Sequence, residues 1–420
     1  MFLVKSILKR GTTILFWVLL ILTPLIFVSN TKELFEFPKM YFVYGVGATV
    51  ILFYLIGVVL EVFSFKLPAW EVSLFIFIVV VSTVFSTHLH TSLWGYYSRF
   101  NGGLVSLLVY FGLFIVAQNI FKRQELFSVF SIGLVLTAFP ISLFGIAQHF
   151  GWGVSSVERV YSTLGQANWL AAYLVWPMLL ALHQFLRSSN KKGYWIWFLS
   201  FGVSFLCFWF TYSLSGILSF IVGFLVLLGL NYKRYDFRKI AAVLLVVFSI
   251  VVSFPGIFFL KARDVFIDLQ QFFLSGFYVY AQDTSRQVSD PGFIRLGLWK
   301  GTLNVVFSSW KNFFVGTGPE TFPYNFPFFR PDILNYSSEW DYILNKPHNF
   351  YLELLSETGV LSLLLYFWIL AKGLVQKHPL ITPLLVAFFV VNFFSWPTVA
   401  ASLYFWILLA VIFKKEFADE

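Results

Sequence analysis

One histidine stands where a polar stretch gives way to a hydrophobic one. His348 opens the sequence HNFYLELLSETG and is flanked by Pro347 and Asn349. Because proline suits the first turn of a helix, we expect a helix to start here with His348 in that turn. The positive end of the helix dipole would keep the imidazole neutral, so that it could act as a general base. The alternative is an interfacial residue that only forms hydrogen bonds.

Three arginines near the ends of other hydrophobic stretches could bind an anion. Arg99 follows the aromatic stretch LWGYYS, Arg159 precedes GQANWLAAYL, and Arg295 lies in GFIRLGLWKGTLNVVF. A guanidinium forms forked hydrogen bonds to phosphate, and the N–H groups of a helix start add further donors. The alternatives are a snorkelling arginine, a solvated helix cap and a helix that meets lipid headgroups. With His348, the three cations would suit a diphosphate and a hydroxyl that loses its proton.

Two carboxylates follow His348 within the same hydrophobic stretch. Glu353 and Glu357 are four residues apart, so they share a helix face. Ionisable groups are costly in a membrane unless they face protein or water. The pair therefore predicts a polar cleft beside His348, or else a shallow helix start. His88 and His90 are two residues apart and do not share a face, which argues against a metal pair, and we expect neither a metal nor a cofactor.

The composition is that of an integral membrane protein. Of the 420 residues, 59% are hydrophobic and only 12% are charged, whereas about 25% are charged in a soluble domain. A net charge of +9 would suggest nucleic acid in a soluble chain, but in a membrane protein it reflects the sorting of Lys and Arg by side. We expect the lipid bilayer, and no nucleic acid, as a partner. Cys207 lies in an apolar run and is expected to serve in packing.

The hydrophobic stretches predict an all-α polytopic protein with about twelve transmembrane helices. Strand-like alternation is absent, and many runs approach the length of about 20 residues that crosses a bilayer. The predicted spans are 12–29, 40–60, 70–86, 102–121, 126–150, 167–186, 194–211, 214–230, 240–260, 348–371, 380–395 and 398–413. The first span is expected to stay uncleaved. Most Lys and Arg of the short loops fall on one side, which predicts cytoplasmic termini. The predicted orientation of the spans after residue 211 depends on a tight turn at 211–216, because a single span over 194–230 would invert them.

A long segment, residues 261–346, separates the ninth and tenth predicted spans. It is too aromatic for a disordered loop, and it contains apolar stretches with scattered charges. We therefore expect short amphipathic helices on the outer face of the membrane. The chain is interpreted as a single membrane domain, 1–420, with this extracytoplasmic insertion.

The stretch HNFYLELLSETG resembles the signature of the O-antigen ligase and O-antigen polymerase superfamily of bacterial membrane glycosyltransferases. That signature is His, then Asn, Ser or Gln, nine further residues and Gly, here His348, Asn349 and Gly359. The family often has Thr three residues later, where this chain has Ser362. The stretches around the three arginines are similar to family motifs and occur in the same order. This resemblance covers nearly the whole chain.

The resemblance implies transfer of a glycan from a polyprenyl-diphosphate carrier to a hydroxyl of a glycolipid or glycan acceptor. Transfer would take place at the outer face of the bacterial cytoplasmic membrane, with inversion and without a metal. By position, His348 would activate the hydroxyl, Arg159 and Arg295 would bind the diphosphate, and Arg99 would be a third cation. Asn349 and Glu353 would support them.

Other functions are less well matched by the sequence. Ligase and polymerase share a donor and differ in acceptor, so the residues do not separate them. A lipid-linked glycan flippase or other transporter would place cations at mid-membrane, yet the predicted spans are almost free of Lys and Arg. A membrane scaffold would leave the position of His348 without a role.

Overall fold

The computed structural model describes residues 2–188, 191–264, 266–267 and 291–414, and within these ranges it contains helices and no strands. Each of the twelve predicted spans overlaps a helix of at least 12 residues. These helices are α1 (Phe2–Leu22), α2 (Glu36–Val59), α3 (Trp70–Val84), α5 (Leu104–Ile120), α6 (Arg123–Phe150), α7 (Ala167–Arg187), α8 (Lys191–Trp209), α9 (Leu214–Asn231), α10 (Phe237–Ser253), α15 (Phe350–Val375), α16 (Ile381–Asn392) and α17 (Val399–Phe413). Shorter helices are α4 (Leu89–Trp94), α12 (Pro291–Phe307), α13 (Trp310–Phe314) and α14 (Phe322–Asn325).

Several of these helices are long and apolar enough to cross a membrane. Among the described residues five qualify: α2, α6, α7, α9 with its 3₁₀ extension, and α15. A sixth would be α10 joined to the helix at 258–264, across a bend of 86°. Other apolar helices have 10–17 residues, shorter than the roughly 20 that span a hydrocarbon core without help from neighbours. The chain is thus an all-helical multispan protein, and the number twelve stays a prediction.

The tight turn expected at 211–216 is present. Helix α8 ends at Trp209 and α9 begins at Leu214, so 194–230 holds two helices and not one. The hydroxyl of Ser213 accepts a hydrogen bond from the N–H of Gly216 and caps α9, while Tyr212 takes a left-handed conformation. This confirms the feature on which the predicted order of the downstream helices depends.

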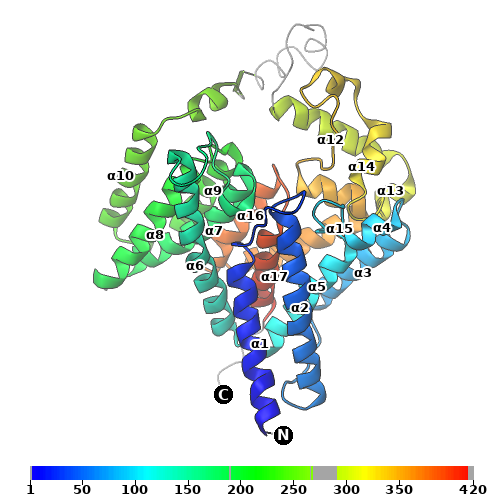
Figure 1. Ribbon diagram of the computed structural model, residues 1–420, viewed down its shortest axis with the longest axis horizontal. Coiled ribbons are helices and arrows are strands. Elements are labelled where there is room, and N and C mark those ends of the chain that lie inside the picture. Colours follow the sequence, from blue (N-terminus) through cyan, green and yellow to red (C-terminus); the bar gives the residue numbers. More distant parts are fainter. Residues whose placement is uncertain (1, 189–190, 265, 268–290, 415–420) are drawn as a thin grey trace.

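Helix α17 runs through the middle of the bundle (Figure 1), packed against α2, α5 and α6. Its sequence, VAASLYFWILLAVIF, has no charged residue, and most of its side chains are buried. A helix that is apolar on all sides needs neighbours on all sides, which explains its place. Glu36 of α2 accepts a hydrogen bond from the N–H of Val399 at 2.7 Å and thereby fixes the start of α17.

Residues 291–346, most of the described part of the predicted long loop, have a small hydrophobic core of their own. Ile294 and Leu298 of α12 pack there against Phe322, Phe326 and Leu334. Helices α12 to α14 lie at one end of the molecule, opposite the start of α1 and the end of α17 (Figure 1). Short helices are therefore found where they were predicted, while residues 268–290 lie outside the described residues. Their position at the outer membrane face stays a prediction.

Candidate functional site

His348 is held by the turn before α15 and not by the helix itself. The side chain of Asn349 accepts hydrogen bonds from the N–H groups of Tyr351 and Leu352, at 3.0 and 3.1 Å, and caps the helix. The expectation that His348 lies in the first helical turn is therefore wrong. Because Asn349 is the better cap, the helix starts one residue after it, and His348 precedes the cap in a left-handed conformation with φ of 54°.

Gly359 breaks the regular course of α15. Its φ of 81° and ψ of 171° are non-helical, and a Cβ atom built there would lie 2.2 Å from the carbonyl oxygen of Phe314. At the same break, Gly318 N–H donates to Glu357 O at 2.8 Å and Thr317 N–H donates to Ser356 O at 3.0 Å. Gly359, the glycine of the family signature, thus allows the segment after α13 to form backbone hydrogen bonds with α15.

Substitution of Gly359 by alanine is expected to destabilise the protein. This backbone conformation is essentially restricted to glycine and costs other residues about 1–3 kcal/mol, and the contact with Phe314 adds to that cost. The midpoint of thermal unfolding in detergent should fall by several degrees. Gly202→Ala in α8 is the control, because nothing lies within 4 Å of its Cβ position. Equal midpoints for both variants would contradict the expectation.

Helix α12 carries Arg295 and contacts the turn that holds His348. The indole N–H of Trp299 donates to the carbonyl oxygen of Pro347 at 3.1 Å, directly before the histidine. One turn earlier, the guanidinium carbon of Arg295 lies 5.9 Å from the ring centroid of Phe394. The predicted helix in this segment is therefore present, and it places Arg295 near the His348 turn.

Trp396 lies at the centre of the candidate site. It belongs to the loop between α16 and α17, and its ring is 5.0 Å from the ring of His348. The guanidinium carbon of Arg99 lies 5.3 Å from the same indole, a cation–π contact, and Trp169 packs against it at 5.9 Å. One tryptophan thus contacts His348, Arg99 and the start of α7.

Arg159 lies in the loop before α7 and contacts the start of that helix. Its Nε–H donates to Thr211 O at 3.0 Å, and Nη2 donates to Asn168 Oδ1 at 2.9 Å. Gln166, the residue at the helix cap, gives no side-chain cap, and the buried indole N–H of Trp169 has no hydrogen-bond partner among the described residues. An arginine, a helix start and an indole N–H therefore present donors in one place.

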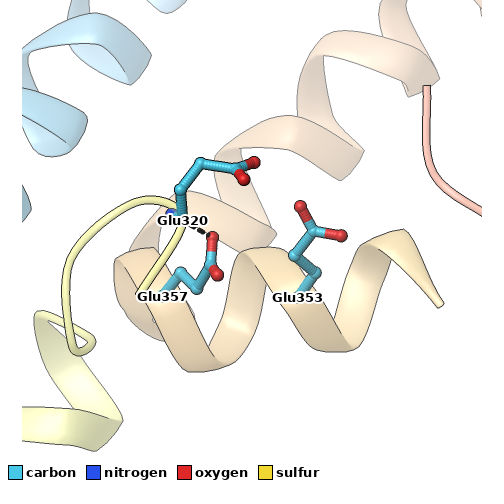
Figure 2. A group of neighbouring side chains, drawn as sticks. All are labelled: Glu320, Glu353 and Glu357. Atoms are coloured by element: carbon cyan, nitrogen blue, oxygen red, sulfur yellow. Dashed lines mark hydrogen bonds between the residues drawn. The ribbon is translucent and has the colours of Figure 1, made fainter. Parts of the chain in front are cut away.

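Three buried carboxylates, Glu320, Glu353 and Glu357, face one another (Figure 2). Lys346 forms ion pairs with Glu320 and Glu353, and Glu357 accepts the N–H of Glu320 at 2.7 Å. Burial lowers the pKa of Lys346, but the two neighbouring carboxylates outweigh it and raise the pKa above its usual value. The side chains could offer a metal one oxygen each, yet the ammonium group of Lys346 already bridges two of them.

The structure brings His348, Arg99 and Arg295 close together. Arg159 is linked to them by a series of contacts: it binds Asn168, whose neighbour Trp169 packs against Trp396. Glu353 adjoins them through Lys346. Sequence reasoning missed Trp396, Lys346 and Glu320. Lys346 carried a signal, since it lies two residues before His348 in NKPHN. Trp396 gave none, because its stretch NFFSWPT is an ordinary aromatic loop between two apolar segments.

Comparison with known protein families finds a match that includes part of this site. Residues 199–367 match the family described as O-antigen ligase. Over these residues the chain is similar to O-antigen ligases. The match includes Arg295 and His348, while Arg99, Arg159 and Trp396 lie outside it. The resemblance to the O-antigen ligase and polymerase superfamily is thereby confirmed over residues 199–367. No curated protein matches the chain.

Within the segment that matches the O-antigen ligase family, His348 is kept neutral. Burial, together with the nearby charges of Arg295 and Arg99, lowers its pKa to about 4 from the usual value near 6.5. Among the described residues no hydrogen bond to its ring was found. A neutral imidazole has a lone pair that can take a proton, and the two guanidinium groups supply positive charge nearby. The arrangement suits proton removal next to a bound anion.

Proposed function

We propose that the protein transfers a glycan from a polyprenyl-diphosphate carrier to an acceptor hydroxyl. The observation that carries the proposal is the neutral His348 beside Arg295 and Arg99, with His348 and Arg295 inside the segment that matches the O-antigen ligase family. A base alone would serve many reactions. Its combination with guanidinium groups suits a reaction in which a hydroxyl attacks and a diphosphate leaves.

In the proposed reaction, His348 takes the proton of the acceptor hydroxyl. The hydroxyl oxygen forms a bond to the anomeric carbon of the donor glycan, and the bond from that carbon to the carrier diphosphate breaks. The electron pair of the broken bond leaves with the diphosphate, whose negative charge Arg159 and Arg295 stabilise. Attack opposite the leaving group inverts the anomeric centre.

The start of α7 supports a diphosphate site. Arg159 uses two of its five N–H groups on Thr211 and Asn168, which orient the guanidinium while leaving donors for a ligand. The uncapped helix start and the N–H of Trp169 would add hydrogen bonds to phosphate oxygens. Arg295 would contact the diphosphate from α12, where its guanidinium group lies over the ring of Phe394.

The proposal places the reaction at the outer face of the bacterial cytoplasmic membrane. Twelve spanning helices would put both termini in the cytoplasm and residues 261–346 outside, with the bilayer locally thinned around shorter helices such as α3 and α16. The donor would then approach laterally from the membrane, because its polyprenyl chain stays in the lipid.

An in vitro assay tests this function. The purified protein in detergent would receive a polyprenyl-diphosphate oligosaccharide, with a glycolipid or a second lipid-linked glycan as acceptor. A ligase is expected to label the glycolipid, whereas a polymerase is expected to lengthen the lipid-linked glycan. Absence of transfer, with movement of the intact donor across proteoliposome membranes, would contradict the proposal and support a flippase.

A further inference from the structure

A cavity lies on the Arg99 side of Trp396, between α3, α5, α15 and α17. It has a volume of about 90 Å³, room for several water molecules. Its walls are largely aromatic and aliphatic, and they include Tyr110, Tyr366 and Trp406. One end is polar. The charged side chains that line this end are Glu36, Arg99, Glu320, Lys346 and Glu353.

Three of these side chains keep a buried polar atom without a hydrogen-bond partner among the described residues. They are Glu36 Oε1, Arg99 Nη2 and Glu353 Oε2. The side chains are strongly buried, with exposed fractions of 1%, 8% and 6%. An unsatisfied buried polar group costs about 1–3 kcal/mol, and more when charged, so three in one cavity indicate a site for a polar ligand.

The charges of the cavity favour an uncharged ligand over an anion. Three carboxylates face two cations, which leaves one formal negative charge. The buried neighbours Lys39 and Glu357, which do not line the cavity, do not change that balance. By formal charge, the cavity therefore has no excess of cations that would attract a phosphate group. A hydroxyl group both donates and accepts hydrogen bonds, which matches two unpaired carboxylate oxygens and one unpaired guanidinium nitrogen.

We propose that this cavity binds the hydroxyl groups of the acceptor sugar, with Glu36, Glu353 and Arg99 as the residues that hold them. Aromatic walls beside a few polar groups are typical of pockets that orient a small ligand. Gly102 lets the carboxylate of Glu320 approach, since a Cβ atom there would lie 2.1 Å from its Oε1. The proposal rests on the proposed function and assigns Arg99 to the acceptor and not to the diphosphate.

The cavity adjoins the reaction site through Trp396, whose ring contacts both Arg99 and His348. Neither Arg159 nor Arg295 lines it. An acceptor sugar held there would present a neighbouring hydroxyl to His348, while the donor diphosphate remains with the other two arginines. The structure thus provides separate places for the two substrates.

Direct binding tests the inference without requiring turnover. Saturation-transfer NMR would use the intact protein in detergent and the methyl glycosides of glucose, galactose, mannose and N-acetylglucosamine. At least one glycoside is expected to bind, and Glu36→Gln and Arg99→Gln should each raise its dissociation constant, measured by titration of the signal, about tenfold or more, as expected for the loss of one hydrogen bond to a charged group. Inorganic pyrophosphate should not displace it.

Glu71→Gln is the matched control. Glu71 is a buried glutamate of α3 that pairs with Lys372 and does not line the cavity, so its loss should leave glycoside binding unchanged. Thermal unfolding identifies variants that fail to fold. Arg99→Gln is included because it keeps the hydrogen bond between Glu36 and the start of α17, which Glu36→Gln could weaken. The inference is overturned if no glycoside binds, if folded cavity variants bind as wild type does, if pyrophosphate displaces the sugar, or if binding requires a divalent cation.

Where transfer is active, the same variants separate the two proposals. Glu36→Gln should raise the KM for the acceptor and leave that for the polyprenyl-diphosphate donor unchanged. A rise confined to the donor KM would overturn the assignment of the cavity while leaving the proposed function intact. Glycoside binding without any glycan transfer would instead overturn the proposed function and leave the sugar-binding cavity standing.

Discussion

Replacement of His348 by alanine is expected to lower the rate of glycan transfer by about 10²–10⁴-fold, the usual contribution of a general base. The side chain is half-buried and packs on Trp396, so alanine removes the base without opening a deeply buried core. Asn349 would still cap α15. Turnover of a polyprenyl-diphosphate oligosaccharide, measured with the purified variant at saturating donor and acceptor, checks the expectation.

The pH dependence separates a base from a structural histidine. Because burial and two arginines lower the pKa of His348 to about 4, it is neutral at pH 7 and becomes protonated only as the pH falls through that value. In the wild type, kcat/KM should therefore decline near pH 4 and not near 6.5. His183→Ala is the control, since that histidine of α7 is hydrogen-bonded to Tyr235 and lies outside the candidate site. Full activity of His348→Ala would exclude the mechanism.

The helices could be predicted from the sequence because their signal is local. A stretch such as VAASLYFWILLAVIF is apolar throughout, so its burial needs no knowledge of its neighbours. The start of α15 was misplaced because Pro347 and Asn349 are both good helix-start residues, and the side-chain hydrogen bonds of Asn349 decided between them. Which helices cross the bilayer depends on tilt and packing, which hydropathy alone does not give.

The candidate site was predicted less completely than the helices. His348, Arg99 and Arg295 could be singled out because charged groups at the ends of apolar stretches are unusual. Trp396 and Glu320 could not, because their roles arise from contacts between segments far apart in the chain: Glu320 meets Lys346, and Trp396 meets Arg99. The cleft predicted beside His348 corresponds to a cavity that Glu353 lines, whereas Glu357 instead binds backbone N–H groups of Glu320 and Phe322.

Replacement of Arg295 by lysine is expected to lower transfer by about 10-fold to 100-fold. Lysine keeps the positive charge but loses the planar fork that can hold two phosphate oxygens at once, and a hydrogen bond to a charged group is worth about 1.5–3 kcal/mol. The loss should fall on the donor: either its KM rises or kcat falls, while the KM for the acceptor is unchanged. Steady-state kinetics with each substrate varied in turn measures both.

Two further variants show whether Arg295 acts through its fork, its charge or the fold. Arg238→Lys, an exposed arginine of α10, should have no effect. In Arg295→Lys the decline of kcat/KM should stay near pH 4, because the charge beside His348 remains. In Arg295→Met it should move up toward 6.5, because one of the causes that lower the pKa of His348 is removed. Unchanged transfer in Arg295→Lys would show that the fork does not contact the diphosphate, and an unmoved pH profile in Arg295→Met would show that its charge does not reach the base.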